Sequence, residues 1–557
     1  MRVLSLTSAN STGMLIFSLA TGFEHIILFK GSAPAPRRVT AMADYSGKFI
    51  FILIVAVLLS SIAAWVIAWR YRRAMQALMR APGAQAGGEA AAAPPEALPA
   101  PRAVSLADNR RAGRQLALLL IALSFLLALS SAAIYMLLSF PDEPFSFKRA
   151  AVVALLYLWP AIPALGLMWR WSRWRVIGAL VLWCVACFPV FLWRSIEPKP
   201  LQLLLWMAIE IGPSMVLVSL VLLGNATRAV APWLLLPFIG LAWASIAGTD
   251  VLTVMMETRS PLLEWLVGWL PAYATIALFV LLPWLLAWWP LRWLGRALGR
   301  AYARKWLSDL LVVFTTVWAM TLATQALSVG SSVGAAGVAM LLPLLWIPLV
   351  MVPCSRLRPR AGRPPTLLVL RVYQRDAQVQ ALFDHVVERW RLSGNTVMIA
   401  GTDLATRTLG ADDIFPFLDG GLAARFVRTP AEVAPRLAAF DMAPDMDGRY
   451  RVNECYCHDA TWQDALRALV SRSDVVLMDL RGFQAHNAGC RFELETLAQA
   501  PGISRVIVLA DAQTDRAVAA QAIGHGQPER FTWLDAARID ARKHREVLAS
   551  LFAATAG

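Results

Sequence analysis

Long runs of apolar residues dominate the first two thirds of the chain. Because a hydrocarbon core about 30 Å thick needs a helix of roughly 20 apolar residues to cross it, each such run predicts a membrane-spanning helix. The pattern therefore indicates a polytopic α-helical membrane bundle of about nine spans within residues 49–354. The predicted spans are 49–69, 115–140, 150–169, 176–193, 201–223, 231–255, 263–289, 306–328 and 335–353.

Two segments interrupt this pattern. Residues 1–48 include a short apolar run at 13–29 that carries a glutamate and a histidine, so it fits an interfacial segment or a poor signal sequence. An alternative is that translation starts at Met42, downstream of this run. Residues 81–101 are rich in Ala, Pro and Gly and cannot bury a core, so they are predicted to form a disordered loop.

A different pattern begins after residue 364, where short apolar runs alternate with amphipathic helices. The runs are apolar throughout, which is typical of parallel strands buried on both faces of a sheet. Residues 365–557 are therefore predicted to form an α/β domain with helices on both faces of a parallel sheet. The strands are expected at 366–373, 396–401, 474–480, 505–510 and 530–534, with an extra strand within 449–457.

Charge is divided unevenly between these two parts. The chain is 58 % hydrophobic and has a formal net charge of +15. Residues 1–364 hold 31 Lys and Arg against 13 Asp and Glu, whereas residues 365–557 hold 21 against 24. The basic excess therefore belongs to the loops of a protein embedded in a lipid bilayer and indicates no nucleic-acid partner.

The loop cations also predict an orientation. One alternating set of loops holds nearly all of them, and cytoplasmic loops retain Lys and Arg. This distribution predicts a multi-pass inner-membrane protein whose carboxyl-terminal domain is cytoplasmic. The basic loops lie within 70–114, 170–175, 292–305 and 356–363, together with Arg228.

Carboxylates inside predicted spans are costly and are often functional. Glu210 and Asp250 are of this kind, so a transporter or channel with a regulatory nucleotide-sensing tail remains an alternative function. The tail has no phosphate-binding loop, dinucleotide glycine fingerprint or zinc-protease motif. Cys455, Cys457 and His458 have metal-ligand chemistry but no second pair at zinc-site spacing, so no metal site is predicted.

Polar residues leave the predicted strands at the edge where open parallel sheets bind ligands. Arg375 and Asp376 follow the first strand, and Asp479 and Arg481 end the third, so these four are candidates for nucleotide binding. Glu493 lies in the first turns of the next helix, at the border of its apolar face, and is the candidate catalytic residue. The alternative is that Glu493 only supports the first turn of that helix, where negative charge suits the dipole.

The tail resembles a TIR (Toll/interleukin-1 receptor) domain in the order of its segments. "LVLRVYQRDAQVQALFDHVVERW", "ALRALVSRSDVVLMDL" and "GCRFELETL" are similar to that family's first strand and helix, middle strand and following helix. The family typically carries a Trp-Cys-x-x-Glu-Leu motif at the last point, which resembles Gly489-Cys490-Arg491-Phe492-Glu493-Leu494 here. Gly489 departs from the motif and removes the packing that its Trp would supply.

The resemblance implies a flavodoxin-like sheet with one of two activities. Some TIR domains cleave NAD at the nicotinamide ribosyl bond, and Glu493 matches their catalytic glutamate. Others are scaffolds that assemble through exposed surfaces, which implies a homo-oligomer formed through the cytoplasmic domain, and an outward Phe492 suits that activity. The same residues also resemble the helix start of nucleoside deoxyribosyltransferase-like domains, where Asp479 would join Glu493 around a nucleotide sugar.

We therefore expect an integral membrane protein with a cytoplasmic TIR-like signalling domain. The domain would bind partners or a nucleotide, and its candidate enzyme activity is that of an NAD nucleosidase. NAD would be its substrate and not a resident cofactor.

Overall fold

The computed structural model contains two compact units. The helical unit comprises Met1–Val66, Leu119–Ala301 and Asp309–Val350, and the sheet unit comprises Ile67–Leu118, Tyr302–Ser308 and Met351–Gly557. The structure describes residues 36–80, 99–194, 200–201, 204, 230–358, 362–371, 381–400, 417–418, 420–458, 460–503, 505–524, 527–540 and 542–556.

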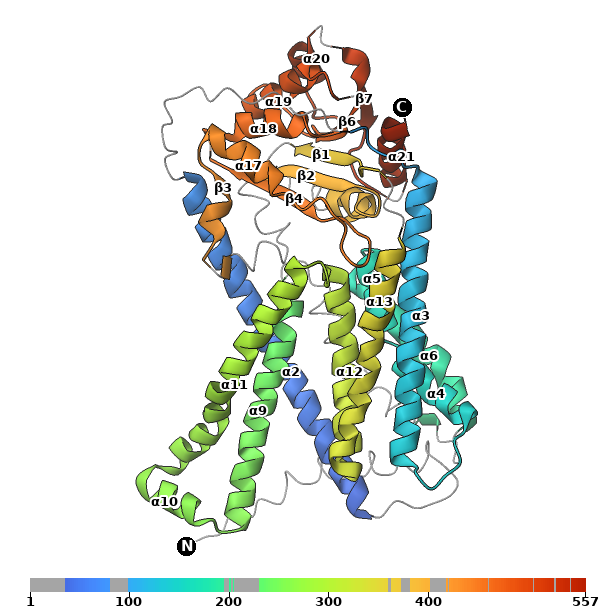
Figure 1. The fold of residues 1–557 in the computed structure, drawn as a ribbon, viewed down its shortest axis with the longest axis vertical. Coiled ribbons are helices and arrows are strands. Elements are labelled where there is room, and N and C mark those ends of the chain that lie inside the picture. Colours follow the sequence, from blue (N-terminus) through green and yellow to red (C-terminus); the bar gives the residue numbers. More distant parts are fainter. Residues whose placement is uncertain are drawn as a thin grey trace. The chain divides into compact units, whose positions relative to one another are not determined.

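The described residues before the sheet are almost entirely helical (Figure 1). The helices are α2 (Pro36–Arg80), α3 (Leu106–Ser139), α4 (Phe147–Tyr157), α5 (Ala161–Met168), α6 (Arg173–Arg194), α9 (Ala231–Glu257), α10 (Pro261–Trp269), α11 (Ala272–Ala303), α12 (Asp309–Val333), the 3₁₀ segment η2 (Gly334–Leu345) and α13 (Trp346–Leu357).

Six helices in the described part of the chain are long and apolar enough to cross a membrane. They are Phe51–Met79, Leu106–Ser139, Arg173–Trp193, Trp233–Glu257, Ala272–Ala303 and Gly334–Leu357. The pair α4 and α5, bent by 43°, raises the number to seven if it is one span. These helices indicate a multi-pass membrane protein.

The prediction of about nine spans is not confirmed. The run predicted as one span at 150–169 is broken at Pro160, between α4 and α5. The run at 263–289 is divided between α10 and α11 at Pro271, because proline supplies no backbone donor to continue a helix. The predicted span at 306–328 overlaps α12, in which Asp309–Ala323 is a shorter apolar helix, and 201–223 lies almost wholly outside the described residues.

A seven-stranded sheet forms the centre of the sheet unit, in the order β3-β4-β2-β1-β5-β6-β7. All six strand pairs are parallel. The strands are β1 (Thr366–Arg371), β2 (Asn395–Ala400), β3 (Phe426–Val427), β4 (Val452–Cys457), β5 (Val475–Asp479), β6 (Arg505–Ala510) and β7 (Phe531–Asp535). The parallel sheet expected from the sequence is confirmed.

Helices and short helical turns alternate with these strands (Figure 1). They are η3 (Phe383–Val387), α15 (Glu388–Trp390), η4 (Leu422–Arg425), η5 (Pro430–Glu432), α17 (Val433–Ala438), α18 (Trp462–Val470), α19 (Ala488–Gln499), α20 (Arg516–Ile523), η6 (Pro528–Arg530) and α21 (Lys543–Ala556).

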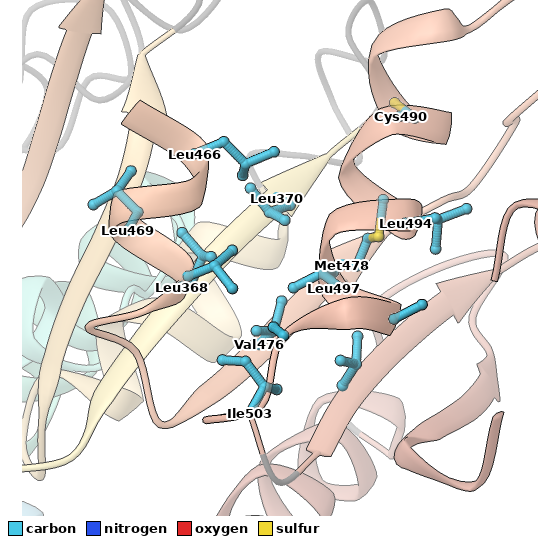
Figure 2. Packing of buried hydrophobic residues seen from close by; sticks show 14 of the residues in the cluster. Leu368, Leu370, Leu466, Leu469, Val476, Met478, Cys490, Leu494, Leu497 and Ile503 are labelled. Atoms are coloured by element: carbon cyan, nitrogen blue, oxygen red, sulfur yellow. The ribbon is translucent and has the colours of Figure 1, made fainter. Parts of the chain in front are cut away.

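Alternate residues of the central strands enter two separate cores, so both faces of the sheet are covered. Figure 2 shows the core formed with α18 and α19, which includes Leu368, Leu370, Leu466, Leu469, Val476, Met478, Leu494 and Leu497. The other core includes Leu367, Val369, Trp390, Val475, Leu477, Val547, Leu551 and Phe552. This alternation fixes the register of β1 and β5, because a shift of one residue would exchange the two faces.

Segments upstream of the tail belong to the sheet unit. Val104 is buried in the core that contains Trp390. The Asn109 amide donates hydrogen bonds to Ser393 Oγ at 2.7 Å and to the Arg389 carbonyl at 2.8 Å. The sheet unit therefore includes residues outside 365–557, and α3 contributes residues to both units.

Predictions for the chain before α3 fall mainly outside the described residues. This holds for the interfacial run at 13–29 and for residues 81–98 of the predicted disordered loop. The last residue of that loop, Pro101, forms a parallel bridge with Arg363.

Candidate functional site

The connections of the sheet reverse direction between β1 and β5. The chain leaves β1 toward β2 on one side and leaves β5 toward β6 on the other. Open parallel sheets bind ligands at such a switch point, beyond the carboxyl ends of the strands. Arg371 and Asp479 are the last residues of these two strands and lie opposite each other in the register.

Glu493 is brought to this edge by α19, the helix that follows β5. The predicted apolar face of the helix is confirmed, because Cys490, Leu494, Leu497 and Ala498 are all buried. Glu493 lies beside that face and is only 5 % exposed. Glu493 therefore lies at the edge of the apolar face of its helix but is buried in the folded domain.

The environment of Glu493 disfavours its charged form. Burial raises the pKa of Glu493 to about 8, against an opposing attraction from the Arg371 guanidinium. No described residue donates a hydrogen bond to Glu493 Oε2. At neutral pH the side chain is therefore mainly a protonated acid, and one of its oxygens lacks a partner within the described structure.

Cys490 lies one helical turn before Glu493 and is also buried. Its thiol is 3.9 Å from the Arg371 carbonyl oxygen, which it faces as a donor. Burial, and then the nearby Glu493 carboxyl, raises the pKa of this thiol well above its usual value. Cys490 is consequently an inert packing residue and not a nucleophile.

Asp479 and Arg481 form a buried ion pair at the end of β5. Arg481 donates to Asp479 Oδ1 through Nε at 2.7 Å and through its backbone nitrogen at 3.2 Å. The two side chains are 6 % and 1 % exposed. This arrangement fixes the loop after β5, and Gly482 in that loop, at a φ of +74°, donates to Asp511 Oδ1 at 2.9 Å.

The structure brings three of the five predicted site residues to one edge of the sheet. Asp479, Arg481 and Glu493 lie at or after the end of β5, whereas Arg375 and Asp376 lie outside the described residues. The sequence reasoning missed Arg371. Its signal was a single charge at the end of the apolar run "TLLVLR".

An aromatic side chain from another helix packs over Gly489. A Cβ placed on Gly489 would lie 4.0 Å from the ring of Trp462, which belongs to α18. Trp462 also packs edge-on against Phe492, with ring centroids 5.3 Å apart. Phe492 is therefore only partly exposed, and assembly through this ring stays a prediction.

The two remaining candidate residues are the carboxylates of the predicted spans. Glu210 lies outside the described residues, and Asp250 lies in α9. Within the described ranges, no group of three or more His, Cys, Asp or Glu side chains is arranged to hold a metal ion.

Comparisons with known proteins find no matching family model, curated protein or solved structure.

Proposed function

We propose that the sheet unit binds a nicotinamide dinucleotide beyond the carboxyl ends of β1 and β5 and hydrolyses its nicotinamide ribosyl bond. The observation that carries this proposal is Glu493, a buried carboxyl group at the switch point of a parallel sheet, one of whose oxygens has no partner among the described residues. A buried polar atom without a partner is costly and calls for an explanation, such as a catalytic role or a bound water or ion. A strongly raised pKa at such a place also favours a functional role.

The strand order is one that the proposal requires. The strands β2-β1-β5-β6-β7 follow the order 2-1-3-4-5 of flavodoxin-like sheets, with β4 and β3 added beyond β2. Both the TIR-like and the deoxyribosyltransferase-like resemblance expect this order. In both, the residue that Glu493 matches is used at an N-glycosidic bond.

The chemistry suits a carboxyl group whose charge depends on the ligand. When the bond from the ribose C1′ to the nicotinamide nitrogen breaks, its electron pair leaves with the neutral nicotinamide and the ribose becomes oxocarbenium-like. Water then adds to C1′ and releases a proton. A cationic pyridinium ring beside Glu493 would favour its ionised form, and the carboxylate would then stabilise the positive charge of the ribose.

The membrane bundle would hold the sheet unit at the membrane, and a change in the bundle would regulate its activity. The charge distribution of the loops favours a cytoplasmic sheet unit at the inner membrane. We propose that the protein signals by binding or consuming nucleotide, or by assembling with further copies, when the bundle changes state.

Release of nicotinamide from NAD by the full-length protein in nanodiscs tests the proposal. The whole chain is needed because residues 99–118 and 302–308 are part of the sheet unit. Glu493→Gln is compared with Glu495→Gln, a matched variant at an exposed position of the same helix. NAD binding is measured on the same samples, and activity is also measured on protein clustered on anionic liposomes.

The outcomes separate three functions. Release by the wild type and Glu495→Gln but not by Glu493→Gln supports hydrolysis at this site. Binding without release, lost in Glu493→Gln, would leave a nucleotide sensor, as the transporter or channel alternative requires. If neither binding nor release occurs after clustering, the nucleotide proposal is withdrawn and assembly is left as the function to test.

A further inference from the structure

The loop between α11 and α12 is built into the sheet unit. Residues 302–308 contact the turn at 441–451, which leads into β4. The Met446 backbone nitrogen donates to the Lys305 carbonyl at 3.2 Å, and Arg358 Nη1, directly after α13, donates to the Met446 carbonyl at 3.2 Å. We refer to residues 302–308, Arg358 and the turn at 441–451 together as the juxtamembrane clasp.

Lys305 has an unfavourable backbone conformation, which its tertiary contacts stabilise. Its φ of +66° lies in the left-handed region, which is unfavourable for a residue with a side chain. Such conformations persist where the surrounding structure fixes them. Here the Lys305 ammonium pairs with Asp441 and donates to the Ala443 carbonyl.

Arg451 joins the loop to the first residue of β4. Its guanidinium lies 3.8 Å from the centre of the Tyr302 ring and donates to the Tyr302 carbonyl at 2.6 Å. The same group donates through Nε to Asp445 Oδ1 at 2.9 Å. Because Arg451 directly precedes Val452, a displacement of the loop acts on the start of the strand.

A second set of buried contacts, centred on Asp447, joins the loop to the turn. Ser308 Oγ donates to Asp447 Oδ2 at 2.6 Å, and Arg449 Nε donates to the same oxygen at 2.9 Å. Burial acts to raise the pKa of Asp447, but attraction to Arg449 and the hydrogen bond from Ser308 hold it below its usual value. Asp447 and Ser308 are 1 % and 0 % exposed, so the contact is part of the interior and not a surface ion pair.

We propose that the juxtamembrane clasp transmits movement of α11 and α12 to β4. The loop that it holds is the covalent connection between those two helices. β4 pairs with β2, which pairs with β1, the strand that ends at Arg371. This coupling is independent of the proposed nucleotide chemistry, since it concerns how the sheet unit responds to the membrane.

Hydrogen exchange of the full-length protein in nanodiscs of short-chain and long-chain lipid tests the coupling. A change in bilayer thickness tilts or shifts membrane helices. The Met446 amide reports the clasp directly, and the amides of β4 report the strand. Lys305→Gln removes the ion pair to Asp441, and Lys543→Gln, which removes an ion pair with Glu546 on α21, is the matched control.

Three results are expected. In the wild type, exchange at Met446 and in β4 depends on lipid length. Lys305→Gln speeds exchange at Met446 by about tenfold or more, because a charge-assisted contact is lost, and abolishes the lipid dependence in β4. Lys543→Gln behaves as the wild type.

Other outcomes would overturn the proposal. Exchange in β4 of the wild type that is the same in both lipids contradicts coupling and needs no variant. Lipid dependence that survives in Lys305→Gln, or that is lost equally in Lys543→Gln, shows that the clasp is not the connection.

Discussion

Replacing Glu493 with glutamine should stabilise the sheet unit, and the gain should grow with pH. The folded state holds the proton of Glu493 up to about pH 8, whereas an unfolded chain releases it near pH 4.5. Between these values the unfolded state binds fewer protons, so wild-type stability falls as the pH rises. Glutamine has nearly the same shape and no proton to lose.

The magnitude follows from the shift in pKa, from 4.5 to about 8. Each pKa unit corresponds to about 1.4 kcal/mol, so the penalty is roughly 3 kcal/mol at pH 7 and approaches about 5 kcal/mol above pH 8. Below about pH 4.5 the penalty vanishes and the two proteins should have equal stability.

Urea titrations of the full-length protein in nanodiscs at pH 5 and pH 8 provide the assay. Unfolding of the sheet unit is followed by pulsed labelling of Cys455, which is fully buried in β4, and mass spectrometry of its peptide. Glu495→Gln, at an exposed position, is the control at each pH. If Glu493→Gln destabilises the protein equally at both pH values, Glu493 is ionised and paired in the fold, and the reasoning is refuted.

Three further substitutions test other parts of the structure. Gly489→Ala should stabilise the protein by roughly 0.5–1 kcal/mol in the same assay, because alanine favours a helix and its Cβ finds ordinary contact distance; a loss would contradict the packing described at this helix start. Gly448→Ala should destabilise it by roughly 1–3 kcal/mol, since φ is +83° and a Cβ would meet Arg358 Nη1 at 2.0 Å; unchanged stability would show that the turn differs. Arg371→Gln should raise the pKa of Glu493 further, so the pH at which the stabilisation by Glu493→Gln levels off should move upward from about 8 in that background, and an unmoved profile would remove Arg371 from the site.

The sheet could be predicted because its strands are buried on both faces. β1, β5 and β6 are apolar runs bounded by polar residues, so composition marks their ends to within about two residues. β3 has only two residues, Phe426–Val427, and was missed because so short a run has no periodicity. The extra strand expected within 449–457 is confirmed as β4.

The environment of Glu493 could not be predicted from its helix alone. Helical periodicity places it at the border of the apolar face, and only the fold brings it near Arg371, far away in the sequence. The packing of Trp462 over Gly489 is another such contact, since the two residues lie on different helices. The number of spans is not confirmed for two reasons: 201–223 lies almost wholly outside the described residues, and hydropathy does not register the break at Pro160.

The sheet unit is built from three separate segments of the chain, and this restricts the possible membrane topologies. A compact unit made of Ile67–Leu118, Tyr302–Ser308 and Met351–Gly557 can form only if all three segments are on the same side. The number of crossings between residues 118 and 302 must then be even, and so must the number between 308 and 351. The charge distribution predicts the same side for the basic loops at 70–114, 292–305 and 356–363, so packing and charge lead to the same expected membrane topology.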